Sequence, residues 1–394
     1  MPILKPMALL ALVLAVGSET SLAFEKVDYE IHLDTVTSGY EGGMCWVHPR
    51  AGILPRETPT VILTTQELFV GGSDFYLGLH TFRTENLGKS WEGPIPEPGL
   101  ARAIHPSGTE AVAADFTPQW HAHSGKLLGT GHTINYDGLK ILRNCPIHPV
   151  YAVYNEDNER WDPWKILDLP EIPMFYRTGA GCCQRVDLPD GDILLPVYHK
   201  GEGEDFSATT VLRCGFDGEN LSYKEHGNTL RQDTIRGFAE PSLTEFKGRY
   251  YLTIRHNERG YVATSGDGLH FSEPLPWFFD TGEELGSYNT QQHWIATGDG
   301  LFLVYTRRGA ENDHVFRHRA PLFIAQVDPD TLCVLRETER VLVPERGARL
   351  GNFGITDVKN NETWVTVAEW MQPVGIEKYG SDNTIYVAKI RWTP

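Results

Sequence analysis

The chain has 394 residues, of which 41% are hydrophobic and 22% charged, as expected for a globular protein with a large core. Its formal net charge of −17 at pH 7 argues against a nucleic-acid partner, and any acidic ligand would need a local cluster of arginines. The 39 glycines, 25 prolines and 11% aromatic residues favour many short strands over long helices.

Residues 1–23 resemble a signal peptide. Lys5 gives a small positive n-region, residues 7–16 form an apolar run too short to span a bilayer, and Ser21-Leu22-Ala23 offers small residues before Phe24. The alternative is an uncleaved membrane anchor. We expect cleavage before Phe24, no stable membrane insertion, and a secreted or periplasmic protein whose residues 24–394 form one domain.

Hairpins recur along the rest of the chain at intervals of about 55 to 75 residues. The sequence predicts outer hairpins over residues 76–94, 150–169, 209–226, 261–276 and 322–343, and a last one over 384–392 that pairs with a strand near 29–33. This spacing predicts an all-β fold, a β-propeller of six four-stranded antiparallel blades, with seven blades as the alternative. The terminal strands would share one blade and close the ring.

Short apolar segments support this interpretation. Residues 60–63, 250–254 and 301–305 are rich in β-branched and aromatic side chains, which suits strands buried between blades. No helical periodicity competes, and no linker divides residues 24–394. The six cysteines show no dense disulfide framework, so we expect most of them to be buried strand residues, with one disulfide possible.

Two hairpins resemble the aspartate box, S-x-D-x-G-x-x-W/F, of sialidases and related repeats. One is Ser265-Gly-Asp-Gly-Leu-His-Phe271, and Thr84-Glu-Asn-Leu-Gly-Lys-Ser-Trp91 looks like a decayed copy. Such a box is a folding device, because Asp and Gly make the tight turn and the aromatic residue fills the blade edge. The chain therefore resembles the sialidase-like β-propellers, a resemblance that implies a fold and says little of function.

A second resemblance to sialidases lies closer to chemistry. Glu240-Pro-Ser-Leu, followed by the strand that ends at Arg255, is similar to the region where sialidases carry a catalytic glutamate and one arginine of a carboxylate-binding triad. By this resemblance Glu240 is a catalytic residue and Arg255 binds substrate. Arg319, which heads the 322–343 hairpin, takes the position of the next triad arginine.

The chain also departs from sialidases at two places. Cys45-Trp-Val-His-Pro49 stands where the family has an R-I-P motif, and Phe353 stands where the tyrosine nucleophile belongs. Phenylalanine cannot form the aryl glycoside intermediate, so the standard sialidase mechanism is not expected unless Tyr288 supplies the hydroxyl from another blade. The many histidines are closer to propeller rhamnosidases and uronic-acid lyases, which use histidine and tyrosine.

Inner strands of a propeller converge on a central channel, so polar residues in them are the further site candidates. We expect catalytic roles for His48 and His132. The expected substrate-binding residues are Arg185, Gln66, Asn289, Gln292 and His293, since amides beside aromatic residues suit sugar hydroxyls. For each of these residues a structural role is the alternative. His121 and His123 share a strand face, but spacing fixes no third ligand, so neither a metal nor another cofactor is predicted.

Three functions fit these residues. The first is a secreted glycoside hydrolase that acts on an acidic sugar, with Glu240 and His48 as an acid/base pair, or with Glu240 activating water or a nucleophile. The second is a polysaccharide lyase, in which arginine neutralises a uronate carboxylate while histidine or tyrosine removes the adjacent proton. The third is a glycan-binding propeller without catalysis. In each case the partner is a carbohydrate; the sequence predicts neither the sugar nor the oligomeric state.

Overall fold

The structure is a computed structural model, and it describes residues 26–72, 74–104 and 108–393. The fold is all-β, because the only helical elements in these ranges are 3₁₀ turns of three or four residues. These turns are η1 (Pro98–Leu100), η2 (Pro173–Phe175), η3 (Phe316–His318), η4 (Arg336–Thr338) and η5 (Ile376–Tyr379).

The described strands form six antiparallel sheets, each named here by one of its strands near the centre. The β2 sheet holds β2 (Met44–Leu54), β3 (Thr60–Phe69), β4 (Tyr76–Thr84) and β5 (Glu92–Pro96). The β7 sheet holds β6 (Ala103–Ile104), β7 (Glu110–His121), β8 (Lys126–Asp137), β9 (Lys140–Ile141), β10 (Pro149–Asn155), β11 (Arg160–Trp161) and β12 (Lys165–Ile166). The β15 sheet holds β13 (Arg177–Gly179), β14 (Val186–Asp187), β15 (Asp192–Lys200), β16 (Ala208–Phe216), β17 (Leu221–His226) and β18 (Leu230–Arg231).

The other three sheets have four strands each. The β19 sheet holds β19 (Ala239–Phe246), β20 (Arg249–Arg255), β21 (Tyr261–Ser265) and β22 (Leu275–Pro276). The β23 sheet holds β23 (His293–Ala296), β24 (Leu301–Tyr305), β25 (Leu322–Val327) and β26 (Arg340–Val343). The β27 sheet holds β27 (Phe353–Lys359), β28 (Glu362–Ala368), β29 (Ile385–Trp392) and β1 (Tyr29–Thr37).

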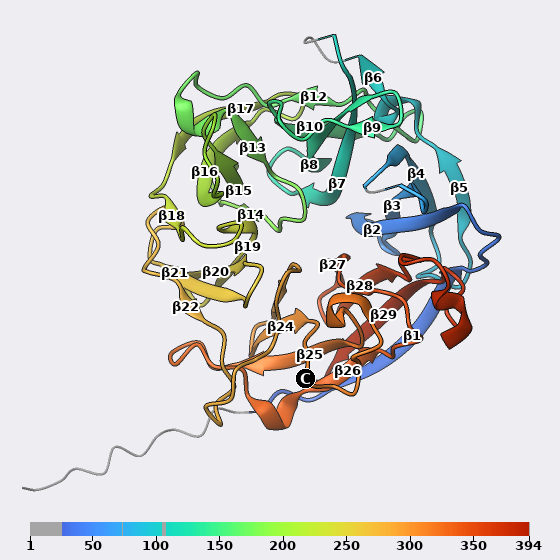
Figure 1. Ribbon diagram of the computed structural model, residues 1–394, viewed down its shortest axis with the longest axis vertical. Coiled ribbons are helices and arrows are strands. Elements are labelled where there is room, and N and C mark those ends of the chain that lie inside the picture. Colours follow the sequence, from blue (N-terminus) through green and yellow to red (C-terminus); the bar gives the residue numbers. More distant parts are fainter. Residues whose placement is uncertain (1–25, 73, 105–107, 394) are drawn as a thin grey trace, which may run out of the picture.

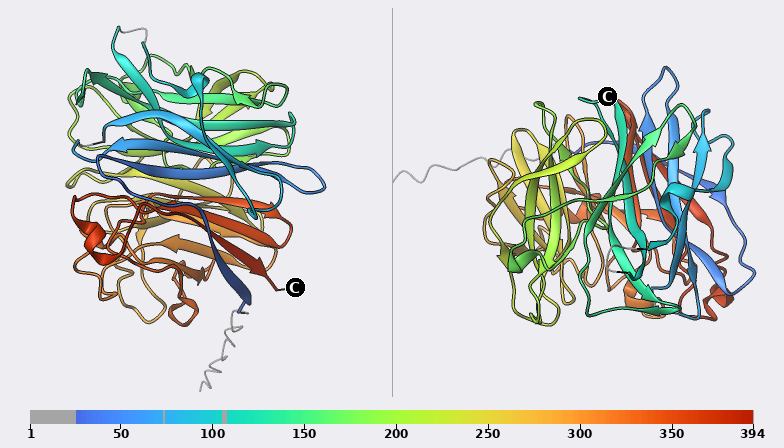
Figure 2. Two further views of the ribbon diagram at one scale, coloured as in Figure 1. Left: turned by 90° about the vertical axis from the view of Figure 1, so that its right-hand side faces the viewer. Right: turned by 90° about the horizontal axis from the view of Figure 1, so that it is seen from above.

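The sheets stand around a common centre, as in a β-propeller (Figure 1). Their strands run along the short axis of the molecule, so the hairpin loops form two opposite faces (Figure 2). The ring closes as the sequence predicts: β1 pairs with β29, with Tyr29 opposite Trp392. Each of the five outer hairpins predicted from the sequence also forms.

Apolar strands fill the space between neighbouring sheets. Every residue of β24 is buried, and it packs between the β19 and β27 sheets in two of the hydrophobic clusters. A strand buried on both faces has no polar alternation, which is why the segment reads as a continuous apolar run. All six cysteines are free thiols in the structure, and four of them are buried, so no disulfide closes the ring.

The two hairpin turns that resemble aspartate boxes are held by similar hydrogen bonds. Asp267 Oδ1 accepts from Ser265 Oγ at 2.8 Å and from two main-chain amides of the turn. In the other turn Asn86 Oδ1 accepts from Thr84 Oγ1 at 2.9 Å and from the Ser90 amide at 3.0 Å. An amide oxygen accepts hydrogen bonds as a carboxylate does, so asparagine preserves the turn.

A left-handed residue recurs where the chain enters the centre from successive sheets. His48, Asp115, Cys182, Glu240 and Asn289 all have φ between 43° and 59°. At His48, Asp115 and Glu240 the strand register shifts at the same point, which marks a bulge. Bulges re-aim a side chain, and strained backbone of this kind gathers at functional sites. These five positions therefore indicate that the centre of the ring is a candidate functional site.

No helix among the described residues has the length and apolarity needed to cross a membrane. The predicted signal peptide, residues 1–23, lies outside the described residues.

Candidate active site in the central pocket

A pocket of about 560 Å³ opens at one end of the ring centre, and all six sheets or their loops contribute to it. Eight Lys and Arg side chains line it against four Asp and Glu, although the whole chain carries a net charge of −17. The eight are Arg143, Arg177, Lys200, Arg236, Arg255, Arg317, Arg319 and Arg349. A pocket with excess positive charge in an acidic protein is suited to an anionic ligand.

Four of these side chains, called here the arginine group, lie close together: Arg255, Arg317, Arg319 and Arg349. Burial lowers the pKa of Arg319 well below its ordinary value, and the cations of Arg255, Arg349 and Arg317 lower it further. The pKa of Arg349 falls to about 10, first through burial. Arg319 and Arg349 are only 4% and 7% exposed. The group therefore holds positive charges together at a cost that an anion would relieve.

Two asparagines hold part of the arginine group in place. Asn289 Oδ1 accepts from Arg255 Nη2 at 2.7 Å, and the Asn289 main-chain carbonyl accepts from Arg319 Nη2. Asn352 Oδ1 accepts from Arg319 Nη1 at 3.2 Å. By contrast, the buried Nε atoms of Arg255, Arg319 and Arg349 have no hydrogen-bond partner in the described part of the chain. The protein's own hydrogen bonds therefore offset only part of the cost of burying these guanidinium groups.

Glu240 lies against this group and pairs with Arg255. Burial acts to raise the pKa of the Glu240 carboxyl, but the charge and hydrogen bond of Arg255 outweigh it and the pKa falls below the usual value. The carboxylate is therefore ionised at neutral pH. Its bulge in β19 points it into the pocket, where the resemblance to sialidases led us to expect it.

Tyr198 and His132 form a second polar part of the pocket, and the sequence analysis missed the tyrosine. Tyr198 lies in β15 opposite Gly179, where a larger residue would strike its ring. Burial and the charge of Glu240 raise the pKa of its hydroxyl, which makes no hydrogen bond within the described residues. The His132 ring lies 6.0 Å from the Tyr198 ring, and burial lowers its pKa, so it is neutral at pH 7.

His48, predicted as an acid or base, lies beneath the pocket and does not line it. Its Nε2 accepts from Asn352 at 2.9 Å, and its Nδ1 lies 3.1 Å from Asp115 Oδ1. Burial lowers its pKa to about 4, so the ring is neutral. Arg50, fully buried, lies 3.4 Å from the same Asp115 oxygen. Through its Nε2 atom His48 positions Asn352, while its Nδ1 lies close to Asp115 without a hydrogen bond.

Four of the predicted substrate-binding residues have structural roles instead. Arg185 donates to the carbonyls of Leu128 and Gln119, and Gln66 donates to those of Leu77 and Ala113. Gln292 is bonded to Ser287 and Thr253, and His293 Nδ1 lies 2.6 Å from Ser242 Oγ. All four are buried and none lines the pocket, because their side chains satisfy polar groups between sheets.

The two residues considered for the tyrosine position also lie outside the pocket. Phe353 is fully buried in the core, and its neighbour Asn352 lines the pocket in its place. The Tyr288 hydroxyl lies 2.6 Å from His318 Nδ1, and Arg308 stacks on its ring. The tyrosines that do line the pocket are Tyr76 and Tyr198.

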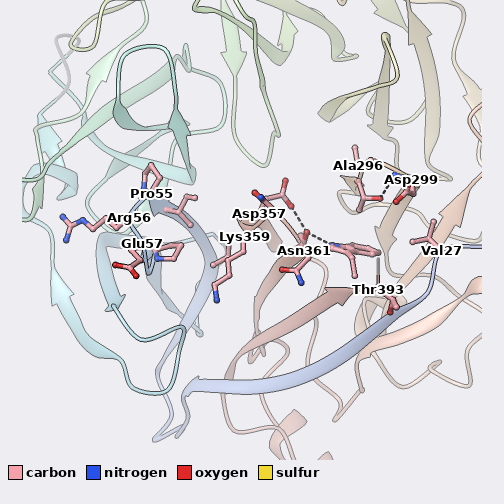
Figure 3. Close-up of a pocket in the computed structure, with 18 residues that line it drawn as sticks. Val27, Pro55, Arg56, Glu57, Ala296, Asp299, Asp357, Lys359, Asn361 and Thr393 are labelled. Atoms are coloured by element: carbon pink, nitrogen blue, oxygen red, sulfur yellow. Dashed lines mark hydrogen bonds between the residues drawn. The ribbon is translucent and has the colours of Figure 1, made fainter.

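A larger cavity of about 970 Å³ lies on the opposite face, between the β2–β3, β23–β24 and β27–β28 turns (Figure 3). It has no excess of positive charge: Arg56 and Lys359 stand against Glu57, Asp299 and Asp357. Among the residues that line it there is no group of buried, closely packed charges like the one in the central pocket. The central pocket is thus the better candidate for chemistry, although it is the smaller of the two. No cluster of His, Cys, Asp and Glu that could hold a metal occurs among the described residues.

Comparisons with solved structures show which known proteins share this fold. No family profile and no curated protein sequence matches the chain. Among solved structures, a Dyadobacter fermentans protein of unknown function is 15% identical with a TM-score of 0.62, and the match covers 92% of this chain and 99% of that one. The Hadza microbial sialidase Hz136 is 11% identical with a TM-score of 0.61, over 88% of this chain and 66% of that one.

The Trypanosoma rangeli sialidase solved with sialic acid is 13% identical with a TM-score of 0.60, and the match covers 93% of this chain but 59% of the sialidase. This chain thus spans about three fifths of that enzyme's length. Identities this low show a shared fold and leave activity open. The protein has the β-propeller fold of the sialidases.

Proposed function

We propose that the protein is a carbohydrate-active enzyme that binds an acidic sugar in the central pocket and hydrolyses its glycosidic bond. Each of the six sheets is taken as one blade of the propeller. The observation that carries the proposal is the arginine group: four cations converge on one pocket, and two of them, Arg319 and Arg349, are buried and have lowered pKa values. A sugar carboxylate would accept from these guanidinium groups and offset their repulsion.

In the proposed reaction Glu240 and Tyr198 work together. Glu240 is ionised and Tyr198 protonated in the free protein, so the carboxylate takes the phenol proton as the tyrosine oxygen attacks the anomeric carbon. The leaving oxygen takes a proton from a water molecule in the pocket. The hydroxide so formed then releases the sugar from Tyr198, and Glu240 returns the phenol proton. Tyr198 thus supplies the hydroxyl that Phe353 lacks.

A lyase is the second candidate, and the pairing of His132 with Tyr198 favours it. A neutral imidazole is the form that removes a proton, and His132 lines the pocket beside Tyr198. In this reaction the arginine group neutralises a uronate carboxylate, His132 takes the adjacent proton, and Tyr198 gives its proton to the leaving oxygen. The product carries a new double bond and no water is consumed.

The test is a panel of acidic oligosaccharides with product masses recorded. Hydrolysis predicts products whose masses sum to the substrate plus one water, and loss of turnover in Arg319→Met. Arg308→Met is the matched control, since Arg308 lies outside the pocket and stacks on Tyr288. Products absorbing in the ultraviolet with no added water would favour the lyase. Saturable binding without any cleavage would leave a glycan-binding propeller, the third function expected from the sequence.

We also propose that residues 1–23 direct export, from the charge and apolar run in the sequence alone. N-terminal sequencing of the mature protein should then begin at Phe24, and a protein retained in the cytoplasm with residues 1–23 intact would contradict this.

A further inference from the structure

The pocket contains a second basic feature, distinct from the arginine group. Arg177 in β13 and Lys200 in β15 are directly opposite each other in register, so both side chains leave the same face of the sheet. Both line the pocket. Like charges directly opposite one another destabilise a sheet, so a structural role does not account for this pair. We call these two residues the basic pair.

No carboxylate neutralises the basic pair among the described residues. The Lys200 ammonium has neither an ion pair nor a hydrogen bond there, and Arg177 donates to the main-chain carbonyl of Cys145, which orients it without cancelling its charge. Arg236, exposed beside them on the loop before β19, likewise has no side-chain partner in this part of the structure, and the cation of Arg255 lowers its pKa. Positive charge therefore continues from the arginine group to the basic pair.

The strand register fixes how far the basic pair lies from the proposed chemistry. Tyr198 and Lys200 are two residues apart in β15 and share a face, and so do their partners Gly179 and Arg177. Two residues of a strand span roughly 7 Å. The basic pair thus lies about one sugar residue beyond Tyr198, towards the end of the strand. The volume of the pocket, about 560 Å³, is in the range of pockets that bind whole ligands and not only small fragments.

We propose that the substrate carries acidic groups on two adjoining sugar residues. The arginine group would hold the carboxylate of the sugar that is cleaved, and the basic pair would hold a second anion, a sulfate ester or a carboxylate, on the next residue. This inference rests on the proposed function, since it assumes that an acidic sugar occupies the arginine group. It adds a substrate class: an acidic glycan with anionic groups on two neighbouring sugar residues.

The experiment measures dissociation constants by calorimetry for two matched disaccharides. Both join a hexuronic acid to an N-acetylhexosamine, and only one carries a sulfate on the hexosamine. The wild-type protein should bind the sulfated disaccharide at least tenfold more tightly. Lys200→Met, which removes no contact of the fold, should erase most of that preference and leave the affinity for the unsulfated disaccharide within about twofold. Lys126→Met, at the start of β8 and outside the pocket, is the matched control.

A third probe, a disaccharide of two uronic acids, distinguishes the source of the second anion. Preference for it over the singly charged disaccharide, lost in Lys200→Met, identifies a carboxylate; preference only for the sulfated probe identifies a sulfate ester. Equal affinity for all three probes, or a preference that survives in both Lys200→Met and Arg177→Met, overturns the inference while the proposed function stands. Absence of binding by every probe, or binding unaffected by Arg319→Met, overturns both.

Discussion

Replacing Arg349 by methionine should make the free protein more stable and its binding of acidic sugars weaker. Arg349 is almost fully buried and its pKa falls to about 10 through burial and the nearby cation of Arg317, partly opposed by Tyr76. Because the folded pKa lies below the unfolded value, the cost is present at every pH below about 10 and fades only as the group deprotonates. Methionine has a similar length and carries no charge.

The magnitude follows from the pKa and the contacts that the substitution removes. A fall from 12.5 to about 10 corresponds to about 3 kcal/mol of cost for the charged form. Against this, Arg349 donates to Gln372 Oε1 at 3.0 Å and lies 4.2 Å over the Trp370 ring, contacts worth about 1 kcal/mol each. The net expectation is a gain of about 1 kcal/mol in the free energy of unfolding.

The assay is urea unfolding at neutral pH together with calorimetric titration of an acidic sugar. The variant should lose about 10- to 100-fold in affinity, the loss expected for one charge-assisted hydrogen bond. Arg308→Met should change neither quantity by a comparable amount. If Arg349→Met instead destabilised the fold by more than about 2 kcal/mol and bound the sugar as the wild type does, the arginine group would be a structural network and the reasoning would be refuted.

Three further results are expected. Tyr198→Phe should lower kcat at least about 100-fold with little change in KM, because the variant keeps the ring but lacks the attacking oxygen; unchanged progress curves would exclude the tyrosine from the reaction. Burial lowers the pKa of His199 from 6.5 to about 4, so the folded protein keeps it neutral and the free energy of unfolding falls as pH drops from 6.5 towards 4. His199→Phe should reduce that loss by about 2–3 kcal/mol, measured by urea unfolding at the two pH values. An identical acid loss in the variant would contradict this. Gly181→Ala should impair activity more than stability, since its Cβ would lie 2.0 Å from His132 Nδ1, and wild-type kinetics would show that the ring position does not matter.

The sequence predicted the propeller because its evidence is local and repeated. Hairpin boundaries depend on turn residues and short apolar runs, and both are visible without knowing how the strands meet. Ring closure by β1 and β29 followed from the same pattern. Glu240, Arg255 and Arg319 line one pocket, which agrees with the expectation from the resemblance that they lie together, while their roles stay a prediction.

The rest of the site depends on side-chain direction, which sequence alone does not give. Gln66 and Gln292 lie in or beside strands near the centre but satisfy polar groups between sheets. Tyr198 looks like an ordinary strand tyrosine until the register places it opposite Gly179. Arg349 lies in a loop just before β27 and belongs to no motif. One signal was available: an acidic residue follows apolar residues in two of the inner strands, Asp115 in β7 and Glu240 in β19.

The central claim, that the arginine-lined pocket cleaves an acidic glycan by adding water, is tested most directly by digestion in ¹⁸O-labelled water. The account predicts that the acidic product released by the wild-type protein gains one ¹⁸O atom, and that Glu240→Gln and Arg319→Met release little or none of it. Products formed without ¹⁸O, or cleavage that persists at the wild-type rate in both variants, would contradict the claim.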